Sequence, residues 1–235
     1  MRTQDSVSAK TRKGRSPDAV VAPGLSAEGL SAPGAIVRRH DRDRYQTALF
    51  APAGRREALF ALYAFNYEVA RVRETVTMPM LGQIRLQWWR EVIAAAYDGV
   101  PDRWHEVVEP LVAAIAEFGL SRAHFDRIID TRERDLADAP PTNLAALVDY
   151  AEGTSSTLIY LALEVLGATE PVTVAAAREV GIAYALAGLL RAMPFHAASG
   201  RSYIPEDIAA RVGLDSAGYA RRRDTPALRG AAAEM

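Results

Sequence analysis

Residues 181–205, G-I-A-Y-A-L-A-G-L-L-R-A-M-P-F-H-A-A-S-G-R-S-Y-I-P, are the stretch around which the chain is organised. It begins as a helix of small and aliphatic residues, and Arg191 comes at the end of this apolar run. Pro194 lacks an amide hydrogen and disfavours helix in the residue before it, so we expect the helix to end or kink near Met193. A polar loop follows, and Pro205 opens a new helix. The pattern is typical of a pocket mouth; a buried helix, an exposed turn and a salt-bridged arginine are the alternative.

The composition limits the classes of function. The chain has 235 residues, of which 49% are hydrophobic, enough for a sizeable core. Its formal net charge of -1 argues against a nucleic-acid binder, which usually carries a basic excess. The absence of cysteine excludes disulfides, zinc–thiolate sites and cysteine nucleophiles. No uncharged apolar run reaches the roughly 18 residues that span a bilayer.

The first part of the chain differs in composition from the rest. Residues 1–38 are rich in Ser, Ala, Gly, Pro and Arg and have no helical or strand period, so we predict a disordered tail. A transit peptide is the rival interpretation, which Asp5, Asp18 and Glu28 weaken. The remaining residues, 39–235, are predicted to form one helical domain.

From residue 41 onward the apolar spacing is helical. We expect helices over residues 41–50, 55–72, 79–98, 104–118, 121–138 and 143–166, the last interrupted at 153–156, and then from 171. The expected apolar stripe of the third helix is Ile84, Trp88, Val92 and Ala95. No run alternates like a strand, so the predicted fold is all-α, with helices packed around a central cavity.

Several segments resemble the squalene and phytoene synthase family in their order and spacing. They are Y-A-F-N-Y-E-V-A-R-V-R-E at 63–74, R-L-Q-W-W-R-E at 85–91, Y-A-E-G-T-S-S at 150–156, Arg191, and G-R-S-Y-I-P at 200–205. The resemblance covers about residues 41–214 and implies an isoprenoid-synthase-like helical bundle. The usual C-terminal helices of that fold are expected to be missing, because the chain stops at residue 235.

The resemblance also implies a chemistry. Active members of the family join two prenyl diphosphates head to head, with magnesium ions held between two aspartate-rich segments. Magnesium requires hard oxygen ligands. In the first segment of this chain the paired aspartates fall on Ala70 and Arg71, and the third acidic position falls on Glu74.

The second segment departs from the family pattern in the same way. The aspartates that follow Arg191 fall on Ala192 and His196. Only Glu74 and Arg191 keep the chemistry of the family, so we assign no catalytic residue and no metal ligand, and we expect no cofactor. The alternative is a working prenyltransferase of isoprenoid biosynthesis with an altered magnesium site.

Three motifs together look like a divergent branch of the family. They are L-R-A-M-P-F-H at 190–196, F-N-Y-E and Y-A-E-G-T-S-S. That branch includes a mitochondrial assembly factor for respiratory complex I. The resemblance therefore implies a non-catalytic relative that acts in complex I assembly. It further implies a complex I subunit or assembly protein as partner, and a cytoplasmic position peripheral to the inner membrane.

The candidate ligand-binding residues are Arg71, Glu74, Arg191, Arg201 and Tyr203. Arginine suits phosphate because its planar guanidinium presents a fork of donors. Arg71 stands where the family has a carboxylate, so the cavity mouth is expected to be basic above an apolar cavity. This arrangement predicts an anionic lipid or prenyl phosphate bound without metal; structural salt bridges are the alternative for each arginine.

Overall fold

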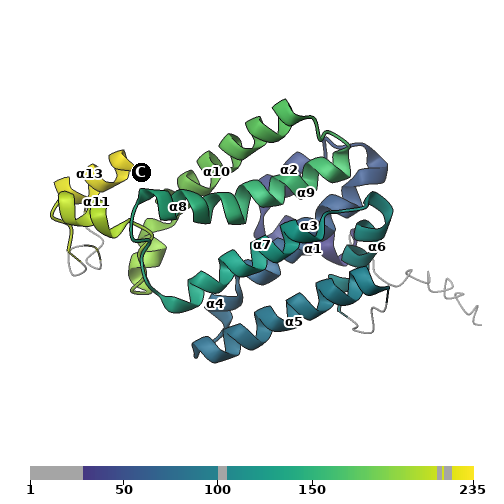
Figure 1. The fold of residues 1–235 in the computed structure, drawn as a ribbon, viewed down its shortest axis with the longest axis horizontal. Helices are drawn as coiled ribbons and strands as arrows, with labels where there is room; N and C mark the ends of the chain where they lie inside the picture. The colour runs from purple at the N-terminus through teal and green to yellow at the C-terminus, as the bar shows by residue number, and fades with distance from the viewer. Residues whose placement is uncertain (1–28, 100–104, 216–218, 220–223) are drawn as a thin grey trace, which may run out of the picture.

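The computed structural model describes residues 29–99, 105–215, 219 and 224–235. These residues form helices and no β-strand, which confirms the all-α prediction (Figure 1). The elements are α1 (Ala32–His40), α2 (Arg42–Ala48), α3 (Ala53–Ala70), α4 (Val72–Thr75), α5 (Pro79–Asp98), α6 (Val108–Phe118), α7 (Arg122–Glu133), the 3₁₀ helix η1 (Arg134–Ala137), α8 (Leu144–Ala151), the π-helix η2 (Glu152–Ser156), α9 (Thr157–Leu166), α10 (Pro171–Ala198), α11 (Glu206–Arg211) and α13 (Pro226–Glu234).

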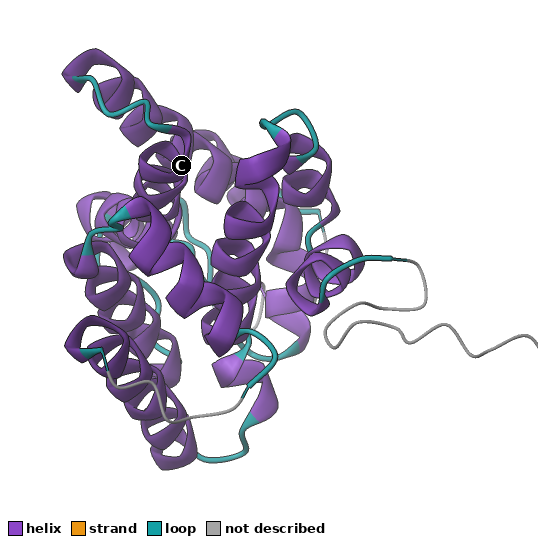
Figure 2. Ribbon diagram, turned by 90° about the vertical axis from the view of Figure 1, so that its right-hand side faces the viewer, coloured by secondary structure: helices purple, strands orange, loops and turns teal. Residues whose placement is uncertain are grey.

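The long helices lie side by side in a bundle. In Figure 1, α5 follows one edge and α10 the opposite edge, with α3, α7 and α9 between them. The turned view shows short loops joining most of these helices (Figure 2). At the end of the molecule near the C-terminus, α11 and α13 pack on each other around a small second core. The main core lies between α3, α5, α6, α7 and α9.

Aromatic rings hold the centre of the main core. The Phe65 ring on α3 meets the Trp89 ring edge-on at 5.3 Å between centroids, and the Phe125 ring on α7 at 5.4 Å. Offset and edge-on ring pairs are favourable beyond the area they bury. These three side chains therefore join α3, α5 and α7.

The predicted buried face of α5 was right in part. Val92 is buried and Trp88 packs partly buried against the main core, as predicted, but Ile84 is exposed. The buried face also includes Leu86, Trp89 and Ile93, so it is turned toward these residues and away from Ile84. Packing against α7 selects the face with Trp89, because that ring fills the space beside Phe65.

Local signals in the sequence set several helix ends. Pro79 occupies the first turn of α5, and Gly99 follows its last residue with a left-handed φ of 74°. Asn143 precedes α8, where its side chain accepts a hydrogen bond from the Ala146 amide at 2.9 Å. The predicted start at Pro79 and end before Gly99 are thus confirmed.

The predicted boundary of the tail at residue 38 was wrong. Residues 1–28 lie outside the described part of the chain, but α1 begins at Ala32 and packs on α3. Ser31 caps this helix by accepting a hydrogen bond from the Gly34 amide at 3.1 Å. Val37 is fully buried, and the His40 ring stacks on the Tyr67 ring at 4.3 Å. The helical body therefore starts several residues before the predicted domain.

The expected helix end near Met193 was also wrong, since α10 continues through Pro194 to Ala198. A proline inside a helix removes one backbone hydrogen bond. Ala197 is buried in the second core, and Met193 packs against the same cluster. This tertiary packing offsets the lost hydrogen bond, so the helix does not end at Pro194.

Helix α10 has an unusual composition for an outer helix. It is 28 residues long, and a window of it has a mean hydropathy of 1.4, so by length and composition alone it could cross a bilayer. A helix in the core of a soluble protein passes the same test. Gly181 and Ile182 are buried against the bundle, whereas Val172, Val180 and Phe195 are exposed.

The predicted interruption at residues 153–156 is confirmed as the π-helix η2, Glu152–Ser156. Gly153 permits the close approach of η2 to α7, because a Cβ atom at that position would lie 2.3 Å from Oγ1 of Thr131. Single π-helical turns inserted in α-helices occur frequently at functional sites. This one lies between α8 and α9 and contacts α10.

Candidate functional site

A buried carboxylate, Asp135 on η1, organises a network of polar side chains. Its Oδ1 accepts hydrogen bonds from the hydroxyls of Tyr150 at 2.9 Å and Tyr203 at 2.7 Å. On its other side, Arg132 Nη1 donates to Asp135 Oδ2 at 3.3 Å and to the Tyr150 hydroxyl at 2.8 Å. Asp135 is only 7% exposed, so these partners compensate the burial of its charge.

Two further arginines extend the network toward the surface. Arg201 Nη2 donates to the Tyr203 hydroxyl at 2.8 Å, and its guanidinium lies 3.8 Å from Asp135 and 3.5 Å from Asp138. Arg73 on α4 donates through Nε to Asp138 Oδ1 at 2.8 Å, and this bond lowers the pKa of the Asp138 carboxyl. The network thus ties α4, η1, α8 and the segment before α11 together.

The network holds its tyrosines protonated. Burial, followed by the nearby Asp135 carboxylate, raises the pKa of Tyr203 to about 12. Burial likewise raises the pKa of Tyr150 well above its usual value. Both hydroxyls therefore donate to Asp135 at neutral pH, and the carboxylate has its lone pairs occupied. Asp135 serves as an anchor between elements and has no free oxygen for general base chemistry.

His196 packs against Tyr203 of the network. Its ring meets the Tyr203 ring edge-on at 4.8 Å. Burial, followed by the Arg201 guanidinium, lowers the pKa of His196 below its usual 6.5. Its Nδ1 atom is buried without a hydrogen-bond partner. The imidazole is therefore neutral near pH 7.

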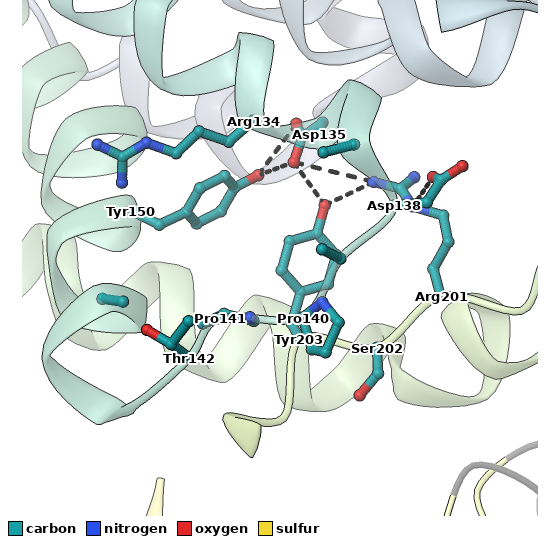
Figure 3. Close-up of a pocket in the computed structure, with 13 residues that line it drawn as sticks. Arg134, Asp135, Asp138, Pro140, Pro141, Thr142, Tyr150, Arg201, Ser202 and Tyr203 are labelled. Carbon is teal, nitrogen blue, oxygen red and sulfur yellow. Dashed lines mark hydrogen bonds and ion pairs between the residues drawn. The ribbon is translucent and has the colours of Figure 1, made fainter. Parts of the chain in front are cut away.

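An open pocket of about 320 Å³ lies beside this network (Figure 3). Pro140 and Pro141 form one wall, and the rings of Tyr150 and Tyr203 form the other, with their hydroxyls turned away toward Asp135. The pocket wall is therefore mostly apolar, because its tyrosine hydroxyls are occupied by internal hydrogen bonds.

A second, central cavity of about 190 Å³ lies between α3, η2 and α10. Asn66 from α3, Ser155 from η2 and Tyr184 from α10 line it. Arg44 and Arg132 contribute two guanidinium groups to its wall. Ala185, Gly188 and Leu189 of α10 also line it, so the lining of this central cavity mixes polar and apolar groups, whereas we expected an apolar interior.

Two segments match the aspartate-rich motifs of the family but lack most of their acidic residues, and we call them the degenerate segments. The first, residues 70–74, lies at the junction of α3 and α4. Ala70 is the last residue of α3 and supplies no ligand atom. Arg71 is half-buried, pairs with Glu68 at 3.4 Å and lies over the Tyr67 ring. Glu74 on α4 is exposed. Neither Arg71 nor Glu74 lines either of the two cavities.

The second degenerate segment, residues 191–196, lies on α10. Arg191 is 76% exposed and pairs with Asp43 at 4.0 Å. Ala192 is half-buried and has no oxygen ligand to offer. The structure thus brings Arg201, Tyr203 and His196 together, but it places Arg71, Glu74 and Arg191 elsewhere. The common basic mouth of Arg71, Arg191 and Arg201 stays a prediction.

The two segments do not fit a magnesium site. Alanine offers no side-chain ligand, and a guanidinium at position 71 repels a cation. In the part of the chain that the structure describes, no group of three or more His, Asp or Glu side chains lies close enough to hold a metal ion.

Several functional candidates were absent from our predictions. Tyr150 belongs to the segment that we matched to the family, but no signal showed that its hydroxyl would meet Asp135. Three others, Asp135, Arg132 and Arg44, lie in charged stretches whose sequence is typical of a solvent-exposed helix face. Only a buried hydrogen-bond partner sets them apart from exposed charged residues. For Asp135 one such partner, Tyr203, is 68 positions away in the sequence.

Comparison with known proteins identifies the lineage. The sequence profile of the family described as squalene/phytoene synthase matches residues 37–235. This chain belongs to the squalene/phytoene synthase family. The match covers the central cavity, the Asp135 network and both degenerate segments, so these features are variations within a known family fold.

Two kinds of relative are similar to this member of the family. The human protein named NADH dehydrogenase (ubiquinone) complex I, assembly factor 6 is 33% identical over 208 residues, which are 85% of this chain and 62% of the human protein. Presqualene diphosphate synthase of Sinorhizobium fredii is 30% identical over 166 residues, or 70% of this chain and 58% of the relative. The chain spans about three fifths of the length of these relatives.

Solved structures support the fold. A dehydrosqualene synthase has a TM-score of 0.76 at 17% identity, over 86% of this chain and 70% of that one. A squalene synthase of Alicyclobacillus acidocaldarius has a TM-score of 0.74 at 21% identity, over 85% and 74%. The predicted isoprenoid-synthase-like helical bundle is thereby confirmed.

Proposed function

We propose that this protein takes part in the assembly of respiratory complex I and does not join prenyl diphosphates. The proposal rests on the lack of magnesium-ligand atoms in the two degenerate segments. Ala70, Arg71 and Ala192 cannot hold magnesium, and without the ion the departing diphosphate is not stabilised. The similarity to proteins named complex I assembly factor 6, from human and from cattle, supports the assembly role.

The proposal includes a partner and a location. A complex I subunit or another assembly protein is the proposed partner, at the cytoplasmic side of an inner membrane and peripheral to it. The exposed apolar residues of α10, Val172, Val180 and Phe195, support such a contact, because each presents an apolar side chain on an outer helix that a partner or a lipid surface would cover. An anionic lipid or prenyl phosphate is the ligand proposed for the exposed Arg191.

A deletion and rescue experiment tests the assembly role. Removing the gene from its native host should reduce fully assembled complex I on native gels, together with NADH:ubiquinone activity in membranes. The wild-type gene should restore both. A Glu74→Gln variant should restore them equally, because the one acidic position that remains in the degenerate segments is not needed for assembly.

An activity assay addresses the alternative, a working prenyltransferase, which the similarity to presqualene diphosphate synthases favours. Purified protein with farnesyl or geranylgeranyl diphosphate and magnesium should release no pyrophosphate. Release that Glu74→Gln abolishes, together with normal complex I in the deletion strain, would overturn the proposal and establish the enzyme instead.

A further inference from the structure

The N-terminal end of α5 protrudes from the body of the molecule. Residues 77–81, T-M-P-M-L, are all exposed, so every side of this turn of the chain reaches solvent. A helix that packs on a core hides one of its faces instead. Figure 1 shows α5 beginning at the lower edge of the bundle, next to α4. We call residues 77–85 the α5 tip.

The exposed side chains of the α5 tip are mainly apolar. Met80 is 64% exposed, and Met78, Leu81 and Ile84 are exposed as well. Apolar residues scattered singly over a surface are normal in soluble proteins, but a group of large ones usually marks a site of interaction. The α5 tip is such a group, because its four large apolar side chains follow one another within one short segment.

The α5 tip is anchored to the bundle on its inner side. Gly82 packs on η1, where a Cβ atom at position 82 would overlap the side chain of Leu136. Leu86, one turn later on α5, is fully buried. The helix is therefore held in place from Gly82 onward, and the apolar side chains of the tip point away from the core.

The chemistry of α5 changes in order along its axis. Apolar side chains predominate in its first two turns, Arg85 and the half-buried Trp88 follow, and the next acidic residue is Glu91. The helix rises by about 12 Å from Met80 to Trp88. Proteins that lie on a membrane bury apolar side chains roughly 5–10 Å deep, with tryptophan and arginine at the level of the lipid head groups. The order of residues along α5 matches this gradient.

The charge of the α5 tip suits an anionic surface. No Asp or Glu occurs between Glu74 and Glu91. Arg85 is exposed and donates from Nη1 to the Thr75 hydroxyl at 2.7 Å, which keeps its guanidinium beside the tip. Within the part of the chain that the structure describes, Arg85 forms no ion pair with a carboxylate. Its charge is therefore available to an anionic head group.

We propose that the α5 tip inserts into the head-group region of an anionic lipid bilayer and is the membrane-docking surface of this protein. Met78, Met80 and Leu81 enter the boundary of the acyl chains, and Arg85 contacts lipid phosphate. A protruding tip buries little area against a flat protein surface, whereas a fluid bilayer conforms to it. The inference rests on the peripheral membrane location proposed above, and it leaves the apolar residues of α10 to a protein partner.

Site-specific labelling of the full chain tests the docking surface. The sequence has no cysteine, so Met80→Cys and Val172→Cys each carry a single nitrobenzoxadiazole label. Val172 is 77% exposed, and the start of α10 lies at the opposite corner of the bundle from the α5 tip (Figure 1). With vesicles of phosphatidylcholine and phosphatidylglycerol, the label at position 80 should brighten, shift to the blue and be quenched by spin-labelled lipid. The label at position 172 should not respond.

Substitutions separate the apolar contribution from the electrostatic one. In vesicle sedimentation, Met80→Glu should weaken binding by about tenfold or more, because it removes an apolar contact and adds a charge that anionic lipid repels. Arg85→Gln should weaken binding by about fivefold, and only to vesicles that contain phosphatidylglycerol. Val172→Glu is the matched control and should bind like the wild type. The melting temperatures should not change, because all three side chains are exposed.

Several outcomes would overturn the docking surface. Wild-type protein that does not bind the phosphatidylglycerol vesicles would do so, as would equal responses of the labels at positions 80 and 172. Dimerisation without lipid, abolished by Met80→Glu, would assign the α5 tip to a second copy of the chain and contradict the proposal.

The docking surface and the role in complex I assembly can fail separately. Normal complex I in the deletion strain contradicts the assembly role, but it leaves a lipid-dependent response at position 80 standing. A silent label at position 80, in a protein whose deletion reduces complex I, contradicts the docking surface alone.

Discussion

The backbone of α10 touches the backbone of η2 where Gly181 faces Ser156. A Cβ atom on residue 181 would lie 2.5 Å from the Cα atom of Ser156. One turn earlier on α10, the Arg178 carbonyl accepts a hydrogen bond from the Ser156 hydroxyl at 2.7 Å. This contact holds the π-helix against α10 and thereby sets the wall of the central cavity at Ser155.

Gly181→Ala should therefore destabilise the fold. Its methyl group overlaps backbone atoms, which cannot rotate away, so we expect the free energy of unfolding to drop by about 3 kcal/mol. Gly188→Ala is the matched control on the same helix, where nothing lies within 4 Å of the added atom. It should raise stability by up to ~1 kcal/mol through helix propensity. Urea denaturation measures both; equal effects would contradict the close approach.

The corrected start of the helical body can be tested at Val37. Val37→Ala should lower the free energy of unfolding by about 2 kcal/mol, because the side chain is fully buried between α1 and the core. The same substitution at Val180, which is 60% exposed on α10, should change stability by less than about 0.5 kcal/mol. If thermal melting gives the two variants the same stability, α1 does not pack on the bundle.

Asp135→Asn tests the anchor of the polar network. The variant leaves Arg132 and Arg201 without their shared buried carboxylate, so we expect a loss of about 3 kcal/mol in unfolding free energy. Asp130→Asn breaks the ion pair of an exposed aspartate with Arg90 and should cost at most about 1 kcal/mol. Chemical denaturation of both variants measures these losses of unfolding free energy. A small loss in Asp135→Asn would show that the network is dispensable for stability.

His196 should make stability depend on pH. Its pKa in the folded protein is lower than 6.5, so the unfolded chain binds a proton more readily as the pH falls below that value. The stabilising contribution is complete above pH 6.5 and is lost as the pH drops toward the pKa of the folded state. The pKa of His40 is also lowered, so it acts in the same direction.

The measurement is the urea midpoint at a series of pH values. His196→Asn should flatten the decline below pH 6.5, with the part due to His40 remaining. An unchanged decline in His196→Asn would show that His196 is protonated as easily in the folded protein as in the unfolded chain.

Local features of the sequence were sufficient for the helical character and for many helix ends. Pro79 and Gly99 bound α5 through backbone preferences that act within one turn, and the break at 153–156 was visible as a run of small polar residues. The loss of ligand atoms at Ala70 and Ala192 is likewise a property of residue type. Such features need no distant partner, because backbone preferences act within one helical turn and an alanine side chain has no ligand atom in any fold.

Tertiary structure decided what depends on distant partners. Pro194 stays inside α10 because Ala197 packs in a second core, and Val37 belongs to the body because α3 covers it. Arg201 meets Asp135, while Arg191 faces solvent, although both were equal candidates in sequence. Burial and pairing of a charge depend on which helices pack together, and no local pattern of residues records that choice.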